Sequence, residues 1–235
     1  MAGSILKRAF GTRTMTRKDL QKLVTELDAI YKCVPYFLAF EDKRGYNIGK
    51  QFPEHLYKGG VYKELQDYWY SPRPGIHTLD RYNVFAGMAG CEWAAYQRAR
   101  HPKAIVMRVY PDDRTAKEEH ILFQLISSLI CSFSTLVPVE FDKVDGLSKR
   151  NFEALAQGGA QGIEAGLEIL ESLPEFEVGG RQFLCIVDAL NLAENKDTVA
   201  DVKKLKAVLE QILARHNAHL LYTVAKPRKR EEDFS

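Results

Sequence analysis

The sequence predicts an α/β fold with a mainly parallel, open sheet and helices on both faces, preceded by a helical and irregular N-terminal extension. Three apolar runs, residues 104–110, 183–189 and 219–225, have the composition of buried strands. The segments between them show the spacing of amphipathic helices. Strands that alternate with helices at this spacing are joined by crossover connections, so the sheet they form is parallel.

Composition divides the 235 residues into four segments. Residues 1–18 are a basic extension, 19–80 a helical and aromatic-rich segment, 81–225 the α/β core and 226–235 a charged tail. A net charge of +2 gives no strong signal for nucleic acid. The four cysteines include no CxxC pair, which argues against a zinc site or a disulfide framework. The longest apolar run, 121–139, is too polar for a membrane span. We therefore expect no metal, no cofactor and no transmembrane segment.

The first eighteen residues have the composition of a mitochondrial transit peptide. No acidic residue precedes Asp19, and Ile5, Leu6 and Phe10 can share one helical face. The basic residues of the segment are Lys7, Arg8, Arg13, Arg17 and Lys18. We expect a mitochondrial location; the alternative is a disordered basic tail on a cytoplasmic protein.

The aromatic-rich segment is the predicted contact with other protein subunits. A helix beginning at Asp19 ends or kinks at Pro35, and one short helix is predicted around residues 61–70. Aromatic side chains dominate the centres of protein interfaces, so these rings are interface candidates. The candidates are Tyr57, Tyr62, Tyr68, Trp69 and Tyr70. The alternative is that they pack on the core of this chain.

The core is predicted to alternate strand and helix. The predicted elements are strand 83–86, helix 91–100, strand 104–110, helices 116–133 and 151–173, strand 183–189, helix 199–216 and strand 219–225. The helix 151–173 contains Gly158, Gly159, Gly162 and Gly166. Each glycine costs about 0.5–1 kcal/mol relative to alanine, which predicts close packing or a break near Gly158.

A glycine-containing turn follows the predicted strand 83–86 and opens the next helix. In a working phosphate-binding loop, two glycines let backbone N–H groups surround the phosphates. A lysine then neutralises charge, and a serine or threonine binds Mg²⁺. In this register Gly87 matches the first glycine, and Gly90 is a permissive spacer.

The rest of that turn has lost the residues that hold a nucleotide. Glu92 stands at the second glycine, Trp93 at the lysine and Ala94 at the hydroxyl. The glutamate repels triphosphate and the tryptophan fills its space. Loss of the lysine and the metal ligand removes interactions worth several kcal/mol.

Two polar residues on apolar strands complete the candidate site. Asp188 ends an apolar strand, where the metal-side carboxylate of such an enzyme would lie, and Thr223 lies on the next strand, where a polar residue would sense the γ-phosphate. Ala189 follows Asp188, so a water-activating acid is absent there. In a vestigial site the carboxylate should be held by backbone N–H groups or by Lys226 or Arg228.

From Tyr70 to Ala225 the order of these features resembles the signal-transduction ATPase (STAND) branch of the AAA-like P-loop families, with its NACHT and archaeal-type relatives. The resemblance implies a P-loop NTPase-like core whose nucleotide site is degenerate. In the family an arginine-bearing lid follows the core, and we expect no counterpart of that lid here. The alternative is that Gly87 and Gly90 form a tight turn in an unrelated α/β sheet.

These observations predict a pseudo-ATPase: a non-catalytic, P-loop-like structural or scaffolding subunit of a larger protein complex, without catalytic residues or a bound metal. A first alternative is a divergent nucleotide-dependent enzyme, an ATPase or transferase that uses Asp188. A second is a cytosolic regulatory module derived from a STAND protein.

Overall fold

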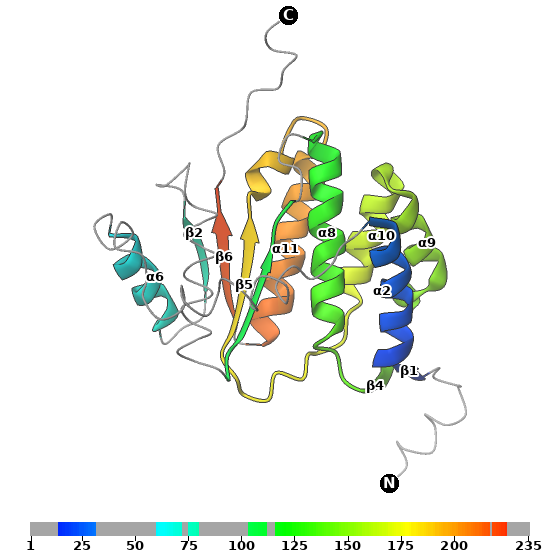
Figure 1. Cartoon of the computed structure of the whole chain (residues 1–235), viewed down its shortest axis with the longest axis horizontal. Helices are drawn as coiled ribbons and strands as arrows, with labels where there is room; N and C mark the ends of the chain where they lie inside the picture. The colour runs from blue at the N-terminus through cyan, green and yellow to red at the C-terminus, as the bar shows by residue number, and fades with distance from the viewer. Residues whose placement is uncertain are drawn as a thin grey trace, which may run out of the picture.

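A four-stranded parallel sheet forms the centre of the protein (Figure 1). Its strands are β2 (Ile76–Leu79), β3 (Ile105–Val109), β5 (Phe183–Asp188) and β6 (His219–Thr223), in the spatial order β2-β6-β5-β3. All three neighbouring pairs are parallel, which confirms the predicted α/β class. The structure is a computed structural model, and it describes residues 14–31, 60–71, 75–79, 103–111, 116–216 and 218–224.

One face of the sheet is covered by α8 (Glu118–Ser134) and α11 (Val199–Arg215), with α10 (Gly159–Glu171) packed against both helices. Phe183, Cys185 and Val187 alternate toward this face and join the apolar core with residues of α8 and α11. All six residues of β5 are buried, as expected of a central parallel strand.

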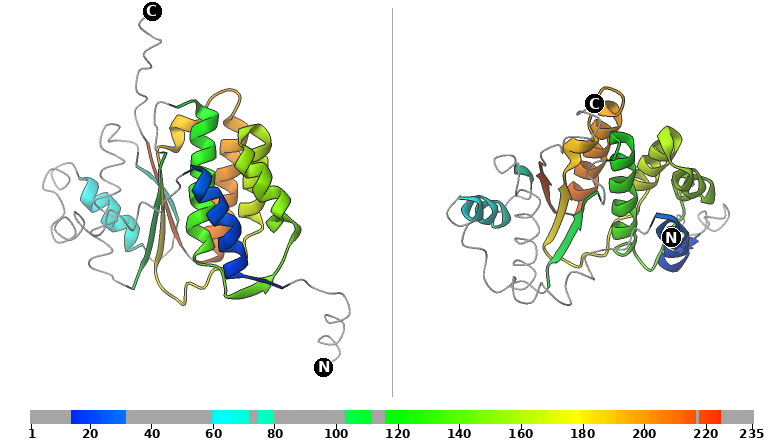
Figure 2. Two further views of the ribbon diagram at one scale, coloured as in Figure 1. Left: turned by 45° about the vertical axis from the view of Figure 1, so that its right-hand side comes forward. Right: turned by 45° about the horizontal axis from the view of Figure 1, so that its top comes forward.

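The helix α6 (Val61–Trp69) lies on the opposite side of the sheet from α8 and α11, next to β2 (Figure 2). Its Tyr68 ring stacks on His77 at 5.2 Å and meets His219 edge-on at 5.0 Å. Trp69 is fully buried and lies 5.6 Å from the ring of His219. The described helices therefore flank both faces of the sheet.

Part of the N-terminal segment is folded against the core. The strand β1 (Thr14–Thr16) pairs antiparallel with β4 (Glu140–Asp142), and α2 (Arg17–Tyr31) packs on α8 and on α9 (Lys149–Gln157). Residues 14–31 are thus in contact with the rest of the described structure.

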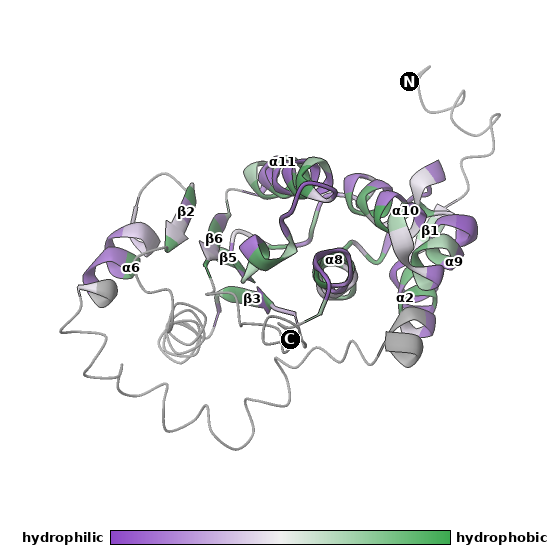
Figure 3. Cartoon of the chain, turned by 90° about the horizontal axis from the view of Figure 1, so that it is seen from above, coloured by the Kyte–Doolittle hydropathy of each residue, from purple (hydrophilic) through white to green (hydrophobic). Residues whose placement is uncertain are grey.

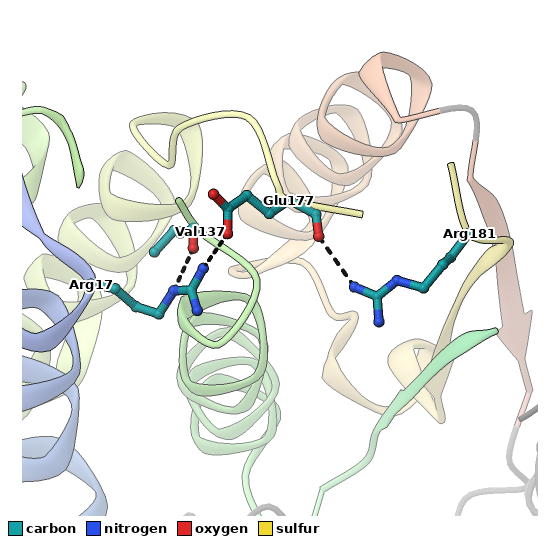
Figure 4. Close-up of polar contacts among 4 residues, drawn as sticks. All are labelled: Arg17, Val137, Glu177 and Arg181. Carbon is teal, nitrogen blue, oxygen red and sulfur yellow. Dashed lines mark hydrogen bonds and ion pairs between the residues drawn. The ribbon is translucent and has the colours of Figure 1, made fainter. Parts of the chain in front are cut away.

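Arg17 fixes this N-terminal element to two loops (Figure 4). Its Nε donates to the Val137 carbonyl oxygen at 2.6 Å, and its Nη2 lies 2.6 Å from Oε2 of Glu177. The Glu177 carbonyl oxygen accepts from Nη2 of Arg181 at 3.2 Å. One guanidinium therefore joins the start of α2, the loop after α8 and the loop before β5.

The glycine-rich helix is interrupted as predicted. It divides into α9 and α10 at Gly158, whose φ of 73° is left-handed. Close packing is confirmed at Gly166, where an added Cβ would lie 2.5 Å from Cγ2 of Ile126. The missing side chain lets α10 approach α8 at this point.

Some of the other predicted helices and strands are present in the structure, and others lie outside the described residues. The helices predicted at 61–70, 116–133 and 199–216 and the strands at 104–110, 183–189 and 219–225 are present with shifted ends. Strand 83–86 and helix 91–100 lie outside the described residues. Sequence analysis missed β1, β2, β4 and the short 3-10 helices η2 (Asp145–Leu147) and η3 (Leu190–Ala193). Among the described residues, no helix has the length and apolar character needed to cross a membrane.

Candidate functional site

Asp188 and Thr223 lie side by side at the carboxyl edge of the sheet. They are the last residues of β5 and β6 and are Cα partners in the parallel register. Leu79, the last residue of β2, is the partner of Thr223 on its other side. Open α/β sheets bind ligands at this edge, so the pairing of Asp188 with Thr223 gives the best candidate site in the described structure.

The Asp188 carboxylate is fully buried and both of its oxygens accept internal hydrogen bonds. Its Oδ1 accepts from the Thr223 hydroxyl, and its Oδ2 lies 2.5 Å from Nη2 of Arg108. Arg108 is the register partner of Ile186, two residues before Asp188, and therefore points to the same face of the sheet. A buried carboxylate is tolerated when a cation and further donors compensate its lost hydration.

Arg108 is a site residue that sequence analysis missed. It is held in place on its other side by the Tyr110 ring, whose centroid lies 4.8 Å from the guanidinium carbon. Its side chain keeps only 12% of its surface exposed. Lys226 and Arg228, the basic partners expected from the sequence, lie outside the described residues. The sequence signal that could have identified Arg108 is its position as a charged residue within an otherwise apolar strand.

The residue after Asp188 has an unusual backbone conformation. Ala189 is buried and adopts φ 60° and ψ 26°, the left-handed region. This conformation costs a non-glycine residue about 1–2 kcal/mol. The Ala189 N–H donates to the Thr223 carbonyl oxygen at 3.0 Å, which ties the turn to the end of β6. Such strain is common beside ligand sites, where the surrounding structure holds it in place.

The predicted phosphate-binding turn falls outside the described residues, as do all five positions assigned to it, Gly87, Gly90, Glu92, Trp93 and Ala94. The strand that pairs with β6 on the side away from β5 is β2, and it ends at Leu79.

The aromatic interface candidates separate into buried and exposed rings. Trp69 is fully buried, and the Tyr68 hydroxyl donates to the Gly75 carbonyl oxygen at 2.9 Å. These two side chains pack on the sheet of this chain, which is the alternative considered for them. Tyr70 is 55% exposed. Tyr57 and the side chain of Tyr62 lie outside the described residues.

The geometry limits the chemistry at this edge. The Asp188 carboxylate already accepts from Arg108 and Thr223, so a metal ion or a proton would compete with these donors for its lone pairs. The described residues contain no group of three or more histidine, cysteine, aspartate or glutamate side chains placed to hold a metal ion. No family model, curated protein or solved structure matches the chain.

Proposed function

We propose that this protein is a non-catalytic α/β protein of P-loop type that serves as a structural or scaffolding subunit of a larger assembly. The observation that carries the proposal is the internal neutralisation of Asp188 by Arg108 and Thr223. In an active site of this type, the carboxylate would face Mg²⁺ and its water. Here a guanidinium of the same chain supplies the positive charge.

The sheet register supports the P-loop part of the proposal. β5 ends in Asp188, and Thr223 is its partner on the neighbouring parallel strand β6. These are the places that the resemblance implies for the metal-side carboxylate and for the polar residue that senses the γ-phosphate.

Thermal unfolding with ATP and Mg²⁺ tests the proposal that the protein is not a nucleotide-dependent enzyme. A ligand at 100 times its Kd stabilises the folded state by about 2.7 kcal/mol. We expect no increase in melting temperature with millimolar ATP–Mg²⁺ or GTP–Mg²⁺, and no hydrolysis above that of Asp188→Ala. Turnover that disappears in Asp188→Ala would refute the proposal.

Isolation of the native protein tests the proposal that it is a scaffolding subunit of a larger assembly. We expect full-length tagged protein, purified from its own cells, to elute in size-exclusion chromatography with a defined set of partner chains, and to localise to mitochondria as the basic residues 1–18 predict. A protein that elutes as a free monomer from a freshly lysed cell would contradict a structural role. A cytosolic complex would leave that role intact and refute the mitochondrial location.

One observation favours a second candidate, an enzyme that uses Asp188. The strained Ala189 turn adjoins Asp188 at the edge where α/β sheets bind ligands. In this case Arg108 releases Asp188 and binds a phosphate group of the substrate. ATP-dependent stabilisation that is lost in Arg108→Met and kept in Tyr70→Ala would support this enzyme over the scaffold.

A further inference from the structure

We propose that the attachment of α6 to the sheet is a pH-sensitive switch, in which protonation of His219 releases the helix. This conformational change belongs to the chain itself and does not depend on the proposed scaffolding role. The register puts His77 of β2 and His219 of β6 on the same face of the sheet, the face that α6 covers. The side chains of α6 that contact these two histidines are Glu64, Tyr68 and Trp69.

The helix α6 depends on the sheet for its stability. It is nine residues long, and Gly60 before it provides no side-chain cap. Isolated helices shorter than about 12–15 residues are marginal in water. Seen from above, α6 lies on the side of the sheet away from α11, and it carries more hydrophilic than hydrophobic residues (Figure 3). A loss of contacts with the sheet would therefore free the helix and expose Leu65 and Trp69, which are both fully buried.

Two aromatic rings of α6 hold His219. The Tyr68 ring meets the imidazole edge-on at 5.0 Å, and the Trp69 ring lies tilted by 30° at 5.6 Å. On its other side the Tyr68 ring stacks on His77 at 5.2 Å, and its hydroxyl donates to the Gly75 carbonyl oxygen at 2.9 Å. Tyr68 thus links both histidines to the helix.

These surroundings suit a neutral His219. Its Nδ1 is buried and has no hydrogen-bond partner among the described residues. From β5 the residue beside it is the apolar Leu184. A protonated imidazole carries an N–H group on both nitrogens, so protonation would leave a charged donor without an acceptor. Attraction between the cation and the Trp69 ring is weaker than the lost hydration of a buried charge.

The sign of the pH dependence follows from this burial. Burial lowers the pKa of His219 in the docked state. Release of α6 returns the ring to water, where a histidine has its ordinary pKa of about 6.5. The released state therefore binds more protons below about pH 6.5. Release becomes easier as the pH falls, until the pKa of the docked state is passed.

The other charged groups of α6 and β2 do not reverse this sign. Glu64 Oε1 lies 2.9 Å from Nε2 of His77, and a protonated His77 would form an ion pair that favours the docked helix. Each of these side chains is 28% exposed, so water screens the pair. Lys63 and Asp67 of α6 are exposed. When both histidines are charged, they also repel each other across the Tyr68 ring.

Hydrogen exchange of the full-length protein at pH 7.5 and 5.5, corrected for the intrinsic rate at each pH, measures the release. We expect the protection of residues 61–69 to fall at least threefold on acidification, with a limit of about tenfold for one proton. The protection of α10 should fall less. An equal fall in α10 would mean that the whole domain opens, and would overturn the switch, as would unchanged protection of α6.

His219→Phe keeps a ring against Tyr68 and Trp69 and cannot titrate, so α6 should stay protected at both pH values. His219→Gln is the second variant if phenylalanine does not fit, and the melting temperature shows that each variant is folded. His77→Gln is the matched control, because its amide can still donate to Glu64 and His219 is retained. We expect the fall in protection to persist in this control. A fall that persists in the His219 variants, or that disappears in His77→Gln, would overturn the assignment to His219.

Discussion

The guanidinium of Arg108 reaches along the sheet toward its carboxyl edge, where Nη2 lies 2.5 Å from Oδ2 of Asp188. The two residues are not register partners, because Arg108 is opposite Ile186. The long side chain bridges this offset and brings its charge to a carboxylate that has no exposed surface. The ion pair therefore connects β3 and β5 at the point where both strands end.

Arg108→Met should strongly destabilise the protein. It leaves the Asp188 carboxylate buried without a cation, and removal of one partner of such a pair costs about 3–5 kcal/mol. Urea unfolding at pH 7 measures the loss. The double variant Arg108→Met with Asp188→Leu removes both charges, and we expect it to recover most of the stability. A single variant within 1 kcal/mol of wild type would show that Arg108 is not the main partner of Asp188.

Trp69→Ala should unfold the isolated protein more easily, whereas Tyr70→Ala should not. Trp69 is fully buried against His219, and truncation of a buried tryptophan costs about 3–5 kcal/mol. Tyr70 is more than half exposed, and surface substitutions usually change stability by less than about 0.5 kcal/mol. Comparison of the two denaturation midpoints is the measurement. Equal midpoints would mean that the Trp69 ring does not belong to the core.

Gly166→Ala should destabilise the protein although alanine favours a helix. The added methyl would lie 2.5 Å from Cγ2 of Ile126 and 3.0 Å from Cδ1 of Leu155. Overpacking of this kind costs about 1–3 kcal/mol, which exceeds the gain of roughly 1 kcal/mol in helix propensity. Ile126→Leu removes the clashing γ-branch, so adding it should offset part of the loss, and Ile126→Leu alone is the control. A more stable Gly166→Ala would mean that α8 and α10 can separate without cost.

Stability should decrease as the pH falls from about 7 toward 5, in part because of His216. Its Nε2 accepts the Phe176 N–H at 3.2 Å, which requires that nitrogen to be unprotonated, and the ring stacks on Phe176 at 4.6 Å. Burial lowers the pKa of His216 below 6.5, Glu175 partly opposes this and Arg215 adds to it. Burial likewise lowers the pKa of His219. Below pH 6.5 the unfolded chain thus binds more protons than the folded one, and protonation favours unfolding until the folded-state pKa is passed.

The measurement is the urea midpoint of wild type and His216→Gln between pH 7.5 and 5. Glutamine can still accept the Phe176 N–H through its amide oxygen and does not titrate. We expect a shallower pH dependence in this variant. The same slope in both proteins would assign the effect to other groups.

The sequence predicts the regular parts of this fold because their signals are local. Continuous apolar runs indicated β3, β5 and β6, and the glycines indicated the interruption of the helix at Gly158. The strand β2 was missed because Ile76–Leu79 is short and half polar, and its burial alternates between exposed and buried. Its strand character comes from pairing with β6, which no local pattern reveals. The same holds for β1 and β4, which pair across most of the chain.

The sequence indicates the strands that carry the candidate site but not the side chains that meet there. Asp188 was expected at the end of one apolar strand and Thr223 on the next, and the observed register makes the two residues partners. Arg108 could not be assigned to Asp188, because the lateral order of strands decides which side chains meet. The unusual backbone of Ala189 has no sequence signal, since alanine rarely adopts it.

The position of β2 in the chain has a consequence for synthesis on the ribosome. In the described structure β2 pairs only with β6, which begins at His219, although β2 itself ends at Leu79. At 5–20 residues per second, the ribosome needs roughly 7–30 s to make the intervening chain. During that time the β2 segment lacks the strand that it pairs with in the described structure. Because β6 lies between β2 and β5, these two parts of the sheet can join only after β6 has been synthesised.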